Sequence, residues 1–277
     1  MKIGFHLSIS NGFIHTFNES LRLNCDIIQI FVKNPRSWAE KEWKKEDIAS
    51  FQVFFKNIPV FVHLSYLPNL ARIDGDERHF RCFLHEVKLC NVLGINSLVV
   101  HCGSNQDIEK GIIQVASAVN RVHETNEIDI LLENSSGHGN GIGKTIAELG
   151  KIFNKIIHKK KVFLCLDTAH LFQAGYDIRK KSTWNRILQE IKALFGEDKI
   201  ALFHLNDSKT GLGSKADRHW HIGKGEIGLQ AFRIISNHAC LSKIPGIMET
   251  PKLKKMDEEN MRVMRSLFSP LVSRSSS

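Results

Sequence analysis

Six short apolar runs of this chain each end in a side chain that can bind a metal ion. The residues that close these runs are His63, His101, Glu133, Asp167, His204 and Glu249. Short apolar runs are typical of buried parallel strands, whose last residues meet at one edge of a sheet. Imidazole and carboxylate groups gathered in one small space are ligands of zinc and similar divalent ions. The pattern therefore predicts a metal site.

Two closely spaced pairs add further candidate ligands. Asp167 and His170 lie in one Asp-Thr-Ala-His segment, directly after a predicted strand. Asp217 and His219 are two residues apart, so in an extended segment both project to the same side. The combined set is too large for one tetrahedral zinc. We expect two or three ions that share a bridging carboxylate, an arrangement that suits phosphodiester hydrolysis.

Single members of this set also have ordinary structural interpretations. A lone His at a strand end is more often a hydrogen-bonded barrel residue, and a lone Asp there often caps the next helix. The joint pattern is what favours ligands. His6 ends the first predicted strand and is assigned to the wall of the site. No ligand role is expected for the remaining histidines, which are His15, His79, His85, His123, His138, His158, His221 and His238.

The spacing of apolar residues predicts alternating strands and helices. Two strands, 2–6 and 26–31, precede the six above, and helical periodicity falls at 13–23, 45–56, 77–93, 111–124, 145–157, 182–195 and, more loosely, 230–235. This repetition predicts an α/β fold of the (β/α)8 TIM-barrel type, a single domain over residues 1–268 with a flexible C-terminal tail at 269–277. In such a barrel, the strand ends form the active-site face. Long loops at 63–76, 134–144 and 206–228 would shape a substrate site, or else vary without function.

Composition narrows the class of partner. The formal charge of +9 and the pI near 9.3 favour a polyanion such as nucleic acid, although a basic surface can also serve solubility alone. The 6 cysteines form no CxxC pair, which favours a reduced cytoplasmic protein. The N-terminus has no apolar export segment, and no apolar stretch is long enough for a membrane helix. A monomer is the default expectation.

One loop has the composition of a nucleic-acid contact. Residues 33–38, Lys-Asn-Pro-Arg-Ser-Trp, combine positive charge with a flat aromatic ring, and Tyr66 raises the same possibility. Such a loop could contact phosphates and wedge between stacked bases. A basic turn anchored by a buried Trp explains the same residues equally well. The basic run at 158–161 is expected to be a solvated helix end.

Longer motifs resemble the endonuclease IV family of abasic-site DNA repair nucleases. The segments 167–177, 204–209 and 213–228 are similar to signature segments of that family. Shorter similarities occur at 34–38, 63–70, 101–104, 133–134 and 249–251. The resemblance runs from the second predicted strand to the last.

The resemblance implies three zinc ions in the barrel. His63, His101 and Glu133 would bind the first ion. The second would be held by Glu133, Asp167, His204 and Glu249, and the third by His170, Asp217 and His219. Glu249 would also orient the attacking water, so Glu249 and the bridging Glu133 are the implied catalytic residues. Manganese could replace zinc, and no organic cofactor is expected.

The same resemblance implies the substrate, double-stranded DNA that contains an abasic site. Hydrolysis 5′ to that site would leave the 3′-hydroxyl that base excision repair requires, and blocked 3′ ends could also be trimmed. Arg36 and Tyr66 match positions that are inserted into bent DNA. Asn34 and Arg218 are the other implied DNA contacts.

The chain departs from the family pattern at a few positions. Cys102 stands where Pro is common, Asn11 where a second Gly is common, and Ser135-Ser136 where Thr-Ala is usual. A packed thiol is expected at Cys102, and Pro68 puts the substrate preference in doubt. Two alternatives remain: a metal-dependent sugar isomerase or epimerase of related barrel fold, and a DNA-damage-binding protein without catalysis.

Overall fold

The computed structural model describes residues 1–253 and 255–268. Within them, eight parallel strands close a barrel in the spatial order β1-β10-β7-β6-β5-β4-β3-β2. The strands are β1 (Ile3–Leu7), β2 (Ile27–Ile30), β3 (Val60–His63), β4 (Ser97–His101), β5 (Asp129–Glu133), β6 (Val162–Asp167), β7 (Ile200–His204) and β10 (Gly246–Met248). The TIM-barrel prediction is confirmed. The proposed tail at 269–277 lies outside the described residues, so its boundary stays a prediction.

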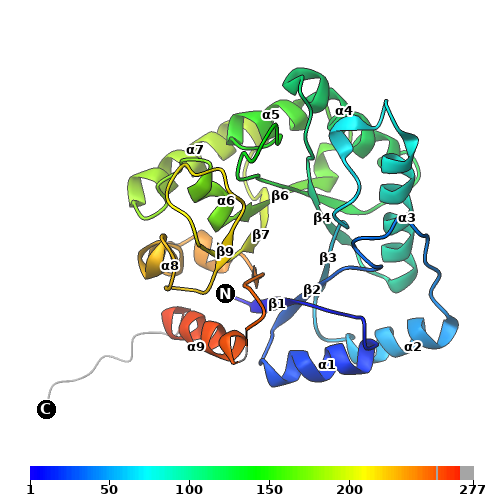
Figure 1. The fold of residues 1–277 in the computed structure, drawn as a ribbon, viewed down its shortest axis with the longest axis horizontal. Helices are drawn as coiled ribbons and strands as arrows, with labels where there is room; N and C mark the ends of the chain where they lie inside the picture. Colours follow the sequence, from blue (N-terminus) through cyan, green and yellow to red (C-terminus); the bar gives the residue numbers. More distant parts are fainter. Residues whose placement is uncertain (254, 269–277) are drawn as a thin grey trace, which may run out of the picture.

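Helices surround the strands (Figure 1). They are α1 (Phe13–Arg22), α2 (Lys45–Phe54), α3 (Glu77–Leu93), α4 (Ile108–His123), α5 (Ile146–Asn154), α6 (Thr168–Gln173), α7 (Lys181–Phe195), α8 (Gly228–Asn237) and α9 (Met256–Phe268). The short α6 and the last helix α9 were not among the predicted helices. The basic run at 158–161 forms the 3-10 turn η2 (Lys159–Lys161) after α5 and not the end of that helix. None of the described helices has the length and apolar character that a membrane crossing requires.

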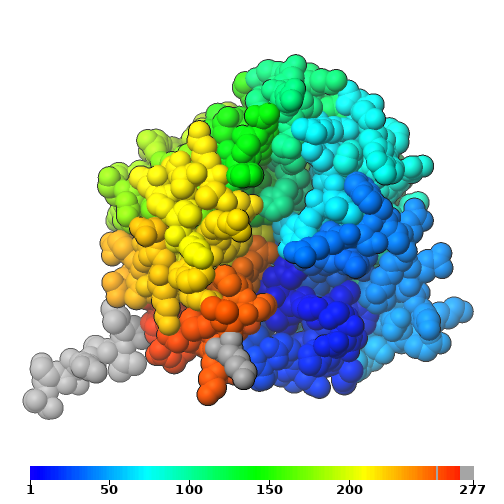
Figure 2. All heavy atoms as spheres, in the orientation of Figure 1, coloured from blue at the N-terminus to red at the C-terminus, as the bar shows by residue number. Residues whose placement is uncertain are grey.

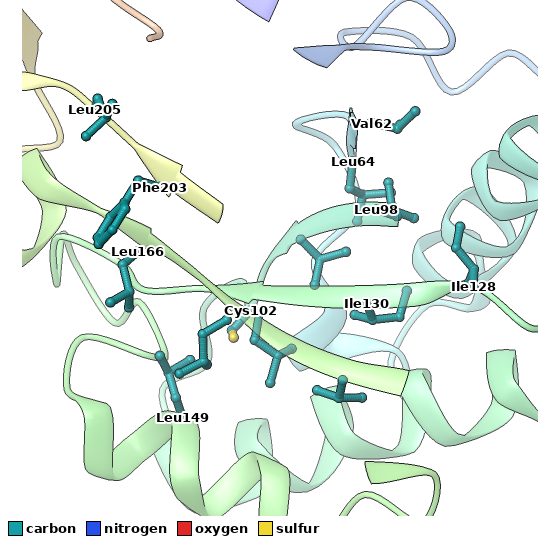
Figure 3. Close-up of a cluster of buried hydrophobic side chains, with 14 of the residues drawn as sticks. Val62, Leu64, Leu98, Cys102, Ile128, Ile130, Leu149, Leu166, Phe203 and Leu205 are labelled. Atoms are coloured by element: carbon teal, nitrogen blue, oxygen red, sulfur yellow. The ribbon is translucent and has the colours of Figure 1, made fainter. Parts of the chain in front are cut away.

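Strand alternation separates two hydrophobic layers. On β5, Ile130 and Leu132 belong to the large outer cluster that also contains Leu149 on α5, and Figure 3 shows Ile130 and Leu149 among its buried side chains. Leu131 belongs instead to a separate cluster, to which six strands contribute one residue each: Ile27, Val99, Leu131, Cys165, Leu202 and Ile247. Six residues that meet from six strands fill the interior of the barrel.

These six residues form what we call the apolar plug. The metal-ligand candidates on the strands lie in the next layer above it, toward the carboxyl ends of the strands. Because side chains on a strand alternate, the residue two positions after each plug residue also points into the barrel. Leu131 is thus followed by Glu133, and Leu202 by His204. The same step leads from Ile27 to Gln29, a residue outside the predicted site. The plug closes the barrel from below and leaves the polar layer at its carboxyl end.

Barrel closure brings the two ends of the chain together. Strand β1 pairs with both β2 and β10, with His6 opposite Gln29 and Phe5 opposite Met248. Gly4 is required at this closure, because a Cβ there would lie 1.6 Å from the Ile27 carbonyl oxygen. The neighbouring helices α1 and α9 are joined by an ion pair (Figure 1). His6, Gln29 and Glu249 thereby become neighbours despite their distance in sequence.

Candidate metal centre and its surroundings

Three groups of side chains at the carboxyl end of the barrel could each hold a metal ion. In every group, one ligand atom per residue lies within 4.8 Å of all the others. The groups are His63, His101 and Glu133; Glu133, Asp167, His204 and Glu249; and Asp167, His170 and His219. The structure thus brings together eight of the nine predicted ligands in these groups. Asp217 is adjacent, with its Oδ1 3.1 Å from His170 Nε2 and 3.8 Å from His219 Nε2.

Glu133 lies between two sets of histidines. Its Oε2 is 3.1 Å from His63 Nε2 and 3.5 Å from His101 Nε2. Its Oε1 is 3.0 Å from His204 Nδ1 and 3.3 Å from His170 Nδ1. The side chain is fully buried. This geometry suits a carboxylate that bridges two cations.

The hydrogen bonds of the histidines fit a metal centre. His63 Nδ1 lies 2.7 Å from the Leu64 carbonyl and His170 Nδ1 lies 3.0 Å from the Asn134 carbonyl. A carbonyl oxygen only accepts, so each Nδ1 donates and each neutral ring turns its Nε2 lone pair toward the site. The lone pair of His63 faces a Glu133 oxygen, and that of His170 faces an Asp217 oxygen. His170 Nε2 also lies 3.3 Å from His219 Nε2. Facing lone pairs require a proton or a metal cation between them, and such second hydrogen bonds are characteristic of metal-binding histidines.

Electrostatics keep the carboxylates ionised. Burial by itself would raise the pKa of Glu133, but His101 and His204 hold it well below its usual range. Burial likewise opposes ionisation of Glu249, yet His204 and His6 hold its pKa well below the usual value. Against the effect of burial, Cys165 and the carboxylates of Glu249 and Glu133 raise the pKa of His204 well above that of a free imidazole. A divalent ion bound there would compete with protons for these groups.

Asp167 is both a candidate metal ligand and a helix cap. Its Oδ1 accepts the backbone N–H of His170 at 2.8 Å and so caps α6. Its Oδ2 accepts from Asn206 Nδ2 at 2.7 Å and lies 3.5 Å from His219 Nε2. The cap holds His170 on the same turn as the carboxylate, which places both side chains at the site.

The segment that contains Asp217 and His219 is positioned by a buried carboxylate. Strand β8 (Asp207–Ser208) pairs with β9 (His219–Trp220) in antiparallel fashion. Asp207, fully buried, accepts backbone N–H groups of Gly223 at 2.9 Å and Gly225 at 3.1 Å, among others. A Cβ on Gly225 would lie 2.3 Å from the Ser208 carbonyl oxygen, so the close approach requires glycine. This predicted long loop is therefore an ordered part of the site.

A cavity of about 610 Å³ opens above these groups. His6, His63, His101, His170, His219 and Glu249 contribute to its wall, together with Tyr66, Lys209, Arg218 and Lys252. In Figure 2 the segment around β9 (yellow), the one after β10 (orange) and the first residues (dark blue) converge near the middle of the face shown. A second hollow of about 630 Å³ adjoins it, with Asn34, Arg36 and Lys41 in its wall. Together these hollows form a groove with basic rims.

Two loops at the rim, which we call the paired loops, comprise residues 33–38 and 64–66. The backbone N–H of Tyr66 donates to the Pro35 carbonyl at 3.1 Å, which joins them. Tyr66 is 58% exposed, and Arg36 and Asn34 are exposed beside it. Arg218 is exposed on the opposite, β9 side of the cavity. The four predicted DNA contacts therefore lie in the walls of the two adjoining hollows.

The paired loops differ in one respect from the expectation. Lys33 is buried and its Nζ donates to the Ser37 carbonyl at 2.5 Å, whereas Trp38 is 37% exposed and packs on His79. The loop is thus anchored by its lysine and not by a buried Trp. Its exposed positive charge comes from Arg36.

Two polar residues of the site were missed as contributors. Gln29 is buried beside His204 and Glu249, and Asn206 bonds to Asp167 and to the backbone N–H of Glu249. The sequence signal for Gln29 was its position as the polar residue of an apolar run. It stands two residues after Ile27, so its side chain also faces the barrel interior. Cys102 directly follows His101 and therefore points the other way, into the outer apolar cluster. Burial raises the pKa of its thiol.

Fold and site define a TIM barrel with a candidate metal centre, and comparison with known proteins agrees with this fold. Residues 17–267 match the family model described as "Xylose isomerase-like TIM barrel". The chain is 38% identical to "Probable endonuclease 4" of Chloroflexus aggregans, over 96% of this chain and 97% of that protein. It is 37% identical to "Probable endonuclease 4" of Nitrosopumilus maritimus, over 95% and 98%.

Solved structures give the same result. The crystal structure of endonuclease IV from Thermus thermophilus superposes with a TM-score of 0.84 at 30% identity, covering 96% of this chain and 98% of that one. A D-tagatose 3-epimerase-like protein, 15% identical with a TM-score of 0.72 over 96% and 97%, shares the fold alone. The chain belongs to the endonuclease IV family. It is accordingly an enzyme of the nuclease class, which hydrolyses phosphodiester bonds.

Proposed function

We propose that this chain is a zinc-dependent endonuclease that hydrolyses the phosphodiester bond 5′ to an abasic site in double-stranded DNA. The observation that supports this most strongly is Glu133, whose two oxygens face separate sets of histidines. A sugar isomerase would need fewer ligands and no exposed wedge at the rim. The product would carry the 3′-hydroxyl used in base excision repair.

Three zinc ions are the proposed complement. The first would be held by His63, His101 and Glu133, the second by Glu133, Asp167, His204 and Glu249, and the third by His170, Asp217 and His219. Asp167 Oδ2 lies close enough to His219 to assist the third group. Bound zinc would lower the pKa of a water molecule and neutralise charge on the phosphate. Manganese is the proposed substitute, because the donor set is nitrogen and oxygen only.

Glu249 is the proposed catalytic carboxylate. Glu133 and Asp167 are fully buried, whereas the Glu249 side chain retains 17% exposure and contributes to the cavity wall. It can therefore accept a hydrogen bond from a water molecule that attacks the phosphate. Its Oε1 is already bonded to Gln29, which leaves Oε2 to face the second metal group and a water molecule held there. Glu133 acts by holding the ligand sets together.

The paired loops would open the duplex. Tyr66 offers an exposed flat ring to the gap left by the missing base, and Arg36 offers a guanidinium to the adjacent backbone. Asn34 would contact the strand on the same side, and Arg218 the strand across the cavity. A flipped abasic nucleotide fits the cavity between them. Blocked 3′ ends, which expose a similar phosphodiester, are proposed as secondary substrates.

The decisive experiment uses three duplex oligonucleotides: one with a single abasic site, one with a blocked 3′ end, and one undamaged. Each is incubated with the zinc-loaded monomeric protein, with and without chelator. We expect cleavage immediately 5′ to the abasic site, with a 3′-hydroxyl product, only without chelator. Turnover of a ketose or aldose with no DNA cleavage would favour a sugar isomerase. Binding to the abasic duplex without cleavage would favour a damage-recognition protein.

A further inference from the structure

Gln29 is a fully buried amide that contacts three site residues from three strands. It lies on β2, and its Oε1 is 2.9 Å from His204 Nε2 on β7. Its Nε2 is 2.7 Å from Glu249 Oε1, directly after β10, and 3.0 Å from His6 Nδ1 on β1. This amide is not a member of the three groups described above. Its contacts nevertheless reach both the proposed catalytic carboxylate and a proposed ligand.

The orientation of the amide follows from its partners. The Glu249 carboxylate can only accept, so the atom that faces it must be the amide nitrogen. The amide oxygen is then turned to His204 and can only accept from Nε2–H. A neutral His204 must therefore carry its lone pair on Nδ1. That atom faces Glu133 Oε1 at 3.0 Å and Glu249 Oε2 at 3.2 Å, at the second metal group.

Because of this amide, the two Glu249 oxygens have different partners. Oε1 accepts from Gln29 and lies 3.1 Å from His6 Nδ1, so it is engaged on the side of β1 and β2. Oε2 is left on the side of His204 and the cavity. A carboxylate held by one oxygen cannot rotate freely about its last bond. Its free oxygen thus keeps one direction while the other groups bind or release.

We propose that Gln29 is a positioning residue that selects the Nδ1-binding form of His204 and aims the free oxygen of Glu249. The proposal rests on the proposed function only in assuming that the second group binds a metal. Residues that hold metal ligands through their second hydrogen bond commonly influence metal affinity by about 10- to 100-fold. Gln29 makes such bonds to two members of one group.

The test is the rate at which zinc leaves the full-length protein in excess chelator, followed with a colorimetric zinc indicator and without DNA. Gln29→Met keeps the length of the side chain and removes both polar atoms. We expect one zinc of the complement to leave at least about 10-fold faster than in wild type. Leu131→Met, a conservative change in the plug just below the site, is the matched control and should release zinc at the wild-type rate.

Gln29→Glu separates the two contacts. It keeps an acceptor for His204 and sets a carboxyl group against Glu249 in place of the amide donor, so His204 should remain a zinc ligand while the hold on Glu249 Oε1 is lost. On abasic duplex its kcat should fall, with KM unchanged. Long-range 15N–1H spectra of the histidine side chains should still show His204 bound through Nδ1 in this variant. If Gln29→Met does not fold, these measurements on Gln29→Glu decide the matter.

The outcomes are distinguishable from those that concern the proposed function. Wild-type zinc release rates in Gln29→Met, or wild-type kcat in Gln29→Glu, would overturn the positioning role. Binding of His204 through Nε2 in the wild-type protein would do so as well. If wild-type protein holds zinc but does not cut abasic DNA, the proposed function fails, while the zinc-release comparison still tests Gln29.

Discussion

The barrel-mouth cluster, meaning the nine proposed ligands with His6 and Gln29, contrasts with the paired loops on the rim. In the cluster, Glu133, Asp167 and His204 are fully buried, and strand register sets their positions. In the loops, Tyr66 and Arg36 are exposed, and their positions depend on a few anchoring contacts. The difference teaches that rigid strand ends suit bond breaking, whereas protruding loops suit recognition of a deformed substrate.

This comparison predicts a division of kinetic effects. Changes within the cluster should lower kcat or metal content and leave DNA affinity largely intact. Changes in the loops should raise KM or Kd and leave metal content intact. The following predictions run from the largest expected effect to the smallest, and each could break the division.

Removal of the metal should have the largest effect. Dialysis against chelator should abolish cleavage of an abasic duplex, because the cluster would then hold only protons. Readdition of zinc should restore it. The thermal unfolding temperature should also fall in the chelated protein, since a ligand that binds only the folded state stabilises it. Full activity with fewer than two zinc ions per chain would contradict the proposed site.

Glu249→Gln should come next. The amide cannot accept a proton from the attacking water, so kcat should fall by roughly 10²- to 10⁴-fold. DNA affinity, measured by fluorescence anisotropy, should stay within a factor of a few. Glu124→Gln, an exposed change outside the site, is the control. If Glu249→Gln lost as much DNA affinity as kcat, the proposed division between catalysis in the cluster and recognition by the loops would be wrong.

Tyr66→Ala tests the loop side of the comparison. Loss of the stacking ring should weaken binding to the abasic duplex by about 1–3 kcal/mol. Zinc content should not change, and Tyr66→Phe, which keeps the ring, should restore most of the affinity. A 2-aminopurine placed opposite the abasic site would report insertion directly. A pure kcat effect would place Tyr66 in the chemistry and not in recognition.

Arg36→Gln should have a smaller effect, one that depends on salt. The slope of log affinity against log salt concentration should become shallower by about one unit, as for the loss of one phosphate contact. Arg186→Gln, an exposed arginine on α7, should leave the slope unchanged. An unchanged slope in Arg36→Gln would remove Arg36 from the phosphate contacts.

The smallest effect concerns the anchor beneath the loops. Glu86 on α3 is buried and accepts from the hydroxyl and the backbone N–H of Ser65, which precedes Tyr66. Burial raises its pKa above the usual 4.5. Its contribution to folding stability is therefore full below pH 4.5 and declines as the pH rises through the folded-state pKa.

Glu86→Gln carries no such proton. The unfolding free energy of wild type relative to this variant should therefore decrease as the pH is raised through that window. Denaturant titrations at several pH values measure this difference. A difference that grows with pH would mean that the ionised carboxylate is the favoured form at this position.

Much of this molecule could be predicted because its patterns are local. Apolar runs marked the strands, and the strand ends marked six ligands that barrel closure then brought together. The helix α6 was missed because it has only 6 residues and follows Asp167 directly, too short a stretch to show helical periodicity. The burial of Lys33 was missed because charge alone suggested a surface contact. Inside the protein, its Nζ donates hydrogen bonds to the Ser37 carbonyl and to Cys82 Sγ.

The sequence by itself determined the barrel, the ligand types and the segments that supply them, because strand periodicity and chemical identity are properties of neighbouring residues. Only the tertiary structure decided which of these side chains lie together. Asp167 reaches His219, and Gln29 connects His6, His204 and Glu249. The physical reason is closure of the barrel, which places β2, β1, β10 and β7 side by side. The strands follow one another around the barrel in chain order, and closure joins the first strand, β1, to the last, β10.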